Sequence, residues 1–304
     1  MAIGISPLVD FAFKMVFGNE HHPRLTIHFL NSMLTDQPRI VSVRILNPIQ
    51  NRKTARGKLS ILDVLATDEI GRILNVEVQT WLPQSMEQRI VYYTARSYVD
   101  QLQKGQNYSA LRPSISICIL AEPLFSDPAE LHLDFRLREK RSHRTLTDDL
   151  QIHVLQLSYL QVTAETVYNA SDEERWLMFL RDADKLTKEQ IIQLFPDKEF
   201  AEAAGVLEMI AKTPEERMEY EARLKYRRDQ AGRRQQALME GHQQGLAEGR
   251  LEGLAKGWQA GQITLMQELL GLPTSTPDEL AACEASQLNQ LVADLQQQLK
   301  ARGF

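Results

Sequence analysis

The chain reads Lys58-Leu-Ser-Ile-Leu-Asp-Val-Leu-Ala66 and, after a short turn, Arg72-Ile-Leu-Asn-Val-Glu-Val-Gln-Thr80. Both stretches are short and rich in apolar and β-branched residues, so they predict two strands. The turn between them ends in a glycine, which favours a hairpin. Folding this hairpin about Ile70 places Asp63 directly opposite Glu77.

Asp63 and Glu77 are the residues of the hairpin that carry chemistry. Like charges directly opposite each other across a strand pair repel, so this pair needs a proton or a cation between the carboxylates. A divalent metal ion held by oxygen ligands fits best. Gln79 lies on the same face of its strand as Glu77, because side chains alternate with a period of two. The residues alone leave a second interpretation open, in which both acids are solvated on an ordinary hairpin.

The composition sets the class of protein. The chain has 304 residues and is 43% hydrophobic, which suits one sizeable domain with appendages, or two domains. No apolar run is long enough for a membrane helix, and the N-terminus lacks the pattern of a secretory signal. The two cysteines, Cys118 and Cys283, form neither a disulfide framework nor a zinc motif. We therefore expect a cytoplasmic protein that has no membrane partner.

The charge is distributed unevenly along the chain. The net charge of −5 does not indicate a nucleic-acid-binding protein. The first 120 residues nevertheless carry slightly more Lys and Arg than Asp and Glu. A mildly basic half that contains Asp63 and Glu77 is compatible with a phosphate-backbone substrate, although the excess is small.

The chain divides into three segments by its sequence pattern. Residues 1–160 alternate between predicted helices and strands, residues 161–212 contain short helices, and residues 213–304 are helical over a long distance. Ser6-Pro7 predicts a helix start, and the apolar run Ser114–Leu120 is typical of a central strand. Further predicted elements are helices at Pro23–Leu34, Ser85–Lys104, Glu173–Leu180, Lys188–Leu194, Lys198–Ala211 and Asp278–Leu299, and strands at Ile40–Leu46, Leu131–Leu137 and Leu150–Leu157.

Six glycines recur at every fourth position: Gly241, Gly245, Gly249, Gly253, Gly257 and Gly261. Each glycine inside a helix costs about 1 kcal/mol relative to alanine. Either the segment is not a stable helix, or another backbone approaches closely along this stripe. In a membrane the spacing would indicate a dimer face, but the segment is charged. We expect a homo-oligomer that assembles through the Gly241–Gly261 helix, with a flexible linker as the alternative.

Several stretches in the first 120 residues resemble one known family. They are Ser6-Pro-Leu-Val-Asp-Phe-Ala-Phe-Lys-Met-Val-Phe-Gly18, Ile45-Leu-Asn-Pro48, Ser60-Ile-Leu-Asp63, Ala66-Thr-Asp68, Asn75-Val-Glu-Val-Gln79, Arg89-Ile-Val-Tyr-Tyr93 and Ser114-Ile-Ser-Ile-Cys-Ile-Leu120. On these residues the chain resembles the Rpn family of recombination-promoting nucleases, also described as PD-(D/E)XK nuclease family transposases. The glycine-repeat tail is similar to family members as well. The resemblance implies an α/β, restriction-endonuclease-like (PD-(D/E)XK) core with a mixed sheet flanked by helices, followed by an all-helical C-terminal tail.

The resemblance also implies metal-dependent cleavage of DNA phosphodiesters. On this basis Asp63 is the motif aspartate and Glu77 is the second ligand of Mg²⁺, or of another divalent ion such as Mn²⁺ or Ca²⁺. The backbone carbonyl of Val78 and the carboxylate of Asp10 are further candidate ligands. The partner implied is DNA.

Gln79 stands where the wider superfamily carries a lysine. Glutamine can hydrogen-bond a water molecule but brings no charge, and it is usual at this place in the family that the chain resembles. We expect Lys14 or Arg89 to supply the missing cation. Arg89 and Tyr92, one turn apart, are candidates to contact phosphate or to brace the site. Asp10 has a second possible role, as a partner for Lys14 at i+4.

Two classes of function follow. The first is a divalent-metal-dependent DNA endonuclease associated with recombination, mobile elements or defence. The second is a catalytically weak or inactive nuclease-fold protein that works by assembling through its helical tail. An RNA-cleaving activity is a third interpretation.

Overall fold

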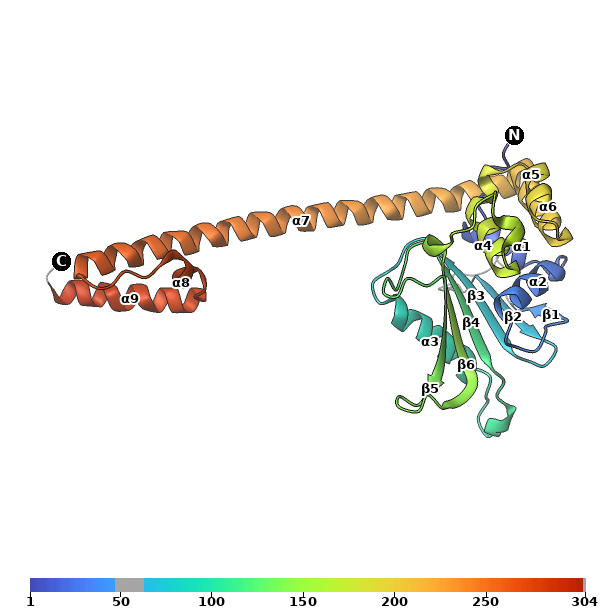
Figure 1. Cartoon of the computed structure of the whole chain (residues 1–304), viewed down its shortest axis with the longest axis horizontal. Coiled ribbons are helices and arrows are strands. Elements are labelled where there is room, and N and C mark those ends of the chain that lie inside the picture. Colours follow the sequence, from blue (N-terminus) through green and yellow to red (C-terminus); the bar gives the residue numbers. More distant parts are fainter. Residues whose placement is uncertain (47–62, 303–304) are drawn as a thin grey trace. The chain divides into compact units, whose positions relative to one another are not determined.

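The structure, a computed structural model, describes residues 1–46 and 63–302 (Figure 1). The chain divides into two compact units, Met1–Tyr226 and Arg227–Phe304. The first unit contains the sheet and all candidate site residues. Part of the first predicted strand, residues 58–62, lies outside the described residues. Among the described helices, none has both the length and the apolar character that a membrane span requires.

Six strands form one mixed sheet in the order β1-β2-β3-β4-β6-β5. They are β1 (Val43–Ile45), β2 (Val64–Asp68), β3 (Ile73–Gln79), β4 (Ser114–Leu120), β5 (His132–Arg138) and β6 (Thr145–Gln156). The central pairs β3–β4 and β4–β6 are parallel, and the outer pairs are antiparallel. This is the mixed sheet that the family resemblance implies, with Ser114–Leu120 as the fully buried central strand that the apolar run predicts.

Helices cover both faces of the sheet (Figure 1). On one side the sheet shares a hydrophobic core with α1 (Asp10–Phe17), α2 (Pro23–Met33), α4 (Asp172–Asp182), α5 (Lys188–Leu194) and α6 (Lys198–Lys212), and on the other it packs against α3 (Met86–Val99). Strand β4 serves both layers because its side chains alternate: Ile115, Ile117 and Ile119 face the first layer, whereas Cys118 and Leu120 face α3. Short 3₁₀ helices lie at η2 (Tyr108–Ala110), η3 (Leu157–Tyr159), η4 (Val167–Asn169) and η5 (Ala183–Lys185).

Trp176 on α4 is fully buried and joins four helices of the first layer. Its ring centre lies 5.3 Å from that of Phe17 on α1, 6.0 Å from Phe29 on α2 and 4.3 Å from Phe200 on α6. Its indole N–H donates to Nδ1 of His28 at 2.8 Å, so the buried donor is satisfied. Helices α4, α5 and α6, which follow residue 160, therefore share one hydrophobic core with the sheet.

The β2–β3 hairpin has the register that the sequence predicts. Val64 pairs with Val76, and the pairing continues to Thr67 with Ile73, which is the same folding about Ile70. Gly71 closes the turn with a φ of +87°, a left-handed conformation that favours glycine. Continuing this register by one residue sets Asp63, which directly precedes β2, opposite Glu77.

Two predicted helix boundaries are wrong. The first helix begins at Asp10 and not at Ser6-Pro7, because the Ser6 amide donates to the Tyr220 hydroxyl at 2.9 Å and residues 6–9 form a turn. Helix α3 ends at Val99, several residues before Lys104. There the Gln101 side chain donates to the carbonyl of Arg112 and accepts from its amide, both at 2.9 Å, and so fixes the loop.

The second unit is a helical hairpin. Helix α7 runs from Pro214 to Leu270 and enters this unit at Arg227, and α8 (Pro277–Ala281) and α9 (Ala285–Ala301) follow. The single helix predicted over Asp278–Leu299 is thus two helices, and Glu284 caps the second. Buried side chains from all three helices form a separate core: Ile263, Met266, Leu270, Leu280, Leu288 and Leu295. The six repeated glycines lie within α7.

Candidate functional site

Asp63 is held at the start of β2 by two contacts. Its Oδ2 accepts a hydrogen bond from the Val78 amide at 2.9 Å, and its Oδ1 lies 3.4 Å from Nζ of Lys14 on α1. Asp63 and Lys14 are both only 6% exposed. The aspartate therefore joins three elements, since its contacts come from β3 and α1 while it directly precedes β2.

Glu77 lies on β3 and faces α3. Its Oε1 accepts hydrogen bonds from Gln79 Nε2 at 2.6 Å and from a terminal nitrogen of Arg89 at 3.0 Å. The residue is 1% exposed, and its neighbour across the parallel pair is Cys118 on β4. Burial raises the pKa of the Cys118 thiol well above its usual value, and the nearby Glu77 adds to the effect. Cys118 is consequently a buried apolar neighbour of the site and not a nucleophile.

Both carboxyl groups have raised pKa values. For Asp63 the main cause is burial; Lys14 and the Val78 amide act in the opposite direction, and the charge of Asp10 raises the pKa further. For Glu77 burial again raises the pKa, Arg89 lowers it, and the charge of Asp63 raises it. The two acids thus repel each other in a poorly solvated place, as the hairpin register predicts. A cation shared by both would relieve this repulsion.

The structure brings most of the predicted site residues into two linked groups. Asp63 contacts Lys14 and the backbone of Val78, whereas Glu77 contacts Gln79 and Arg89.

Asp10 has a different partner from those expected. Its carboxylate pairs with Arg223 on α7 at 3.7 Å, and Lys14 pairs with Asp63 and not with Asp10. Arg223 is a neighbour of the site that sequence reasoning missed, because more than two hundred residues separate it from Asp10 and no local pattern links them.

Arg89 has a second contact that the sequence analysis missed. Its guanidinium carbon lies 5.6 Å from the ring centre of Tyr93, one helical turn further on. The i, i+4 spacing of an arginine and an aromatic residue was the available signal. Tyr92, the residue predicted to brace the site, is largely exposed.

The donor set suits a hard divalent cation. Carboxylate oxygens of Asp63 and Glu77 are the ligands that Mg²⁺ prefers, and this ion usually keeps several water molecules. Two buried polar atoms beside Glu77 have no hydrogen-bond partner within the described chain, Nε of Arg89 and Oδ1 of Asn75. Such orphaned atoms fit a site that an ion, its water or a phosphate completes. Among the described residues no group of three or more His, Cys, Asp or Glu side chains is arranged to hold a metal, so the two acids would bind an ion mainly with water and backbone ligands.

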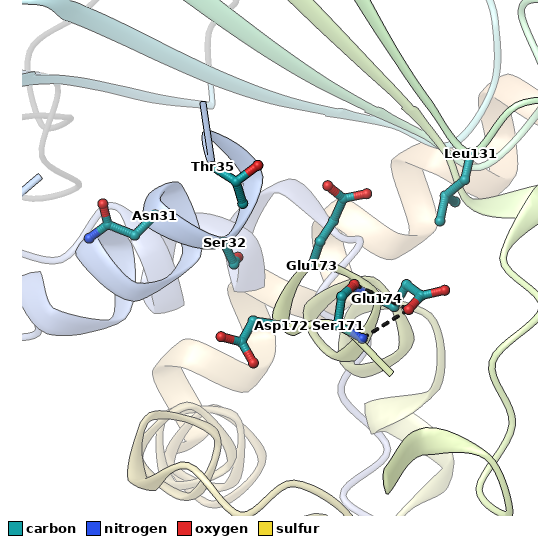
Figure 2. Close-up of a pocket in the computed structure, with 8 residues that line it drawn as sticks. All are labelled: Asn31, Ser32, Thr35, Leu131, Ser171, Asp172, Glu173 and Glu174. Atoms are coloured by element: carbon teal, nitrogen blue, oxygen red, sulfur yellow. Dashed lines mark hydrogen bonds between the residues drawn. The ribbon is translucent and has the colours of Figure 1, made fainter. Parts of the chain in front are cut away.

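Two hollows lie elsewhere, beside α2 and the start of α4. Their volumes are about 390 and 510 Å³. Figure 2 shows the smaller one, where Ser171 and three acids from the start of α4 lie near Asn31, Ser32 and Thr35. Glu174 and Ser171 are already paired as a helix cap. None of the predicted site residues lines either hollow.

The comparisons with known proteins identify one family. Its description is PD-(D/E)XK nuclease family transposase, and its sequence model matches residues 7–237. This range contains all six strands, both acids and the first part of α7. No curated protein and no solved structure matches the chain.

Proposed function

Because this chain belongs to the PD-(D/E)XK nuclease family transposases, we propose that it is a divalent-metal-dependent endonuclease that hydrolyses phosphodiester bonds in DNA. The observation that carries the proposal is the pair of buried acids at the end of the β2–β3 hairpin, Asp63 and Glu77, where the charge of Asp63 raises the pKa of Glu77. In this proposal residues 1–160 carry the reaction, in the cytoplasm, and serve recombination, mobile elements or defence. The free state of the described cysteines agrees with that compartment.

Asp63 and Glu77 would hold Mg²⁺, with the Val78 carbonyl as a further ligand and Asp10 as an outer acid. When bound, the ion supplies a Lewis acid for the phosphoryl oxygen and lowers the pKa of a bound water. Gln79 orients that water through its side-chain amide, which now donates to Glu77.

In this proposal Arg89 and Lys14 neutralise the negative charge of the substrate phosphate. Each now pairs with one of the two acids, and an ion on those acids would release both cations toward the substrate. The Arg89 side chain is 33% exposed, so its guanidinium can reach a phosphate oxygen once it leaves Glu77.

Nicking of supercoiled plasmid in Mg²⁺ tests the proposal. We expect the parent to cut and Asp63→Asn and Glu77→Gln each to lose activity, because each removes a charged ligand of the ion. Glu87→Gln is the matched control, since Glu87 is an exposed acid on α3 near Arg89. A parent that cuts neither this plasmid nor single-stranded DNA in Mg²⁺, Mn²⁺ or Ca²⁺, or acid variants that cut as fast as the parent, would refute this function.

A specific surface also favours assembly as a second function. Residues 213–304 would form the oligomerisation region, and one face of α7 carries five exposed large side chains at spacings of 3, 4, 7 and 4: Leu251, Leu254, Trp258, Leu265 and Leu269. They are between 50% and 72% exposed. A continuous apolar stripe of this kind is typical of a helix that packs on another helix.

The charges beside this apolar stripe suit a second copy of the chain. In an antiparallel pair of α7 helices centred near Gln259, Arg250 of one copy would lie beside Glu268 of the other. Sedimentation of the full chain and of Trp258→Glu tests this assembly. We expect the variant to dissociate, since it places a charge in the middle of the stripe, and a parent that sediments as a monomer would rule the assembly out.

A further inference from the structure

Four large side chains form a row along one side of α3, which we call the α3 flank, and the row begins at Arg89 in the candidate site. Arg89, Tyr92, Tyr93 and Arg96 lie at i, i+3, i+4 and i+7, so they share one side of the helix. Arg89 connects this flank to the site, because it donates to Glu77 and also lies over the Tyr93 ring.

Tyr92 presents its ring to solvent on this flank. It is 57% exposed, and its ring centre lies 5.2 Å from that of Tyr93 at an interplanar angle of 78°. Trp81, which is 38% exposed, follows Gln79 by two residues at the end of β3. Two exposed aromatic rings thus lie on the elements that carry Glu77 and its partner Arg89, Trp81 just after β3 and Tyr92 on α3.

Neither cation of the same flank is left to follow the backbone of a duplex, because Arg89 belongs to the candidate site and Arg96 is paired within its own helix. Arg89 pairs with Glu77 at 3.0 Å, and Arg96 pairs with Asp100 at 3.1 Å and also contacts the Tyr92 phenol. Duplex DNA carries one negative charge for about every 1.7 Å of its axis and is bound mainly by free Lys and Arg side chains. Unpaired bases instead expose π faces, which stack on aromatic rings and need less positive charge.

We propose that this flank of α3 is a stacking platform, with Tyr92 as its central ring, for unpaired bases of DNA next to the cleaved phosphate. The substrate class is then single-stranded DNA, or DNA in which the bases beside the cleaved bond are unpaired. This inference rests on the proposed function for its reaction, whereas the binding step stands on the α3 flank itself.

Fluorescence anisotropy of the full chain tests the platform. The probe is a labelled thymidine oligomer of about 16 nucleotides, compared with a duplex of the same length, with EDTA present so that neither DNA is cut. We expect Tyr92→Ala to weaken binding of the single strand by roughly 5- to 100-fold, the effect of losing one stacked base. Tyr92→Phe keeps the ring and should bind as the parent does. Tyr108→Ala removes an 80% exposed tyrosine that lies before β4, at the opposite end of the parallel strands, and should also leave binding unchanged.

The platform is overturned if Tyr92→Ala binds the single strand within about twofold of the parent, or weakens both DNA forms equally, because stacking on exposed bases requires a selective loss. The same oligomer incubated with Mg²⁺ reports cleavage separately. A parent that binds through Tyr92 but does not cut refutes the proposed endonuclease and leaves the platform intact. A parent that cuts while Tyr92→Ala binds normally refutes the platform and leaves the endonuclease intact.

Discussion

Divalent ions should stabilise the first unit, and Asp63→Asn should remove that effect. An ion that binds only the folded state adds about 2.7 kcal/mol to the unfolding free energy at a hundredfold excess over its Kd. The unit spans residues 1–226, and for a domain of this size each kcal/mol moves the melting temperature by about 2–4 °C. We therefore expect Mg²⁺ to raise the melting temperature by about 5–10 °C.

The pH dependence of the unfolding free energy is a second test of the same prediction. The pKa values of Asp63 and Glu77 are raised in the folded protein, so between the unfolded and folded values the folded chain binds more protons than the unfolded chain. Without metal, the unfolding free energy that these groups contribute must then fall as the pH rises through that window. Mg²⁺ competes with those protons, so its stabilising effect should grow over the same window.

Differential scanning fluorimetry with and without Mg²⁺, across that pH range, measures both effects. Glu87→Gln is again the control and should keep the full shift, because its carboxylate is exposed on α3. A parent whose melting temperature ignores Mg²⁺ and Mn²⁺, or an Asp63→Asn variant that retains the shift, would show that the two acids do not share an ion.

Three further predictions concern stability. Trp176→Ala should cost about 3–5 kcal/mol in urea denaturation, because it empties the centre of the core; a loss below about 1 kcal/mol would contradict that packing. Asp68→Ala should cost a similar amount, about 3–5 kcal/mol, because it leaves the buried guanidinium of Arg72 without its charged partner; unchanged denaturation would show that water reaches this pair. Gly245→Ala and Gly249→Ala should each stabilise α7 by about 0.5–1 kcal/mol, since an added Cβ meets no described atom outside the neighbouring helix backbone within 4 Å. Thermal melts followed by circular dichroism measure this change. A destabilised helix would mean that another backbone packs against these glycines.

Local pattern was enough to predict the hairpin and the central strand. The register of Asp63 and Glu77 followed from the position of one turn, because strand pairing is symmetric about it. The buried run Ser114–Leu120 matched β4 at both ends, since a strand covered on two faces is nearly continuous in apolar residues, and its two serines are small and hydrogen-bonded to Thr94.

Long-range contacts account for what the sequence did not predict. Serine is a favoured residue at a helix N-cap, which is why Ser6 was predicted to start the helix. In the structure the Ser6 amide donates to the Tyr220 hydroxyl and a turn follows, so α1 begins at Asp10. Lys14 was expected to supply a cation to the site, yet whether it would pair with Asp10 or Asp63 depended on how α1 packs against β2. The order of residues along the chain does not show which of these two carboxylates lies closer to Lys14 in the fold.

The ion pairs that Lys14 and Arg89 form with the two acids also affect how the site would bind a metal. Each acid already has an internal counter-ion, which offsets part of the effect of burial on its pKa. In the proposed function a metal would have to displace these cations, so its net affinity would be the difference between two competing attractions. Occupancy would then follow the free magnesium level of the cell, and the protein would stay folded and silent when that level falls.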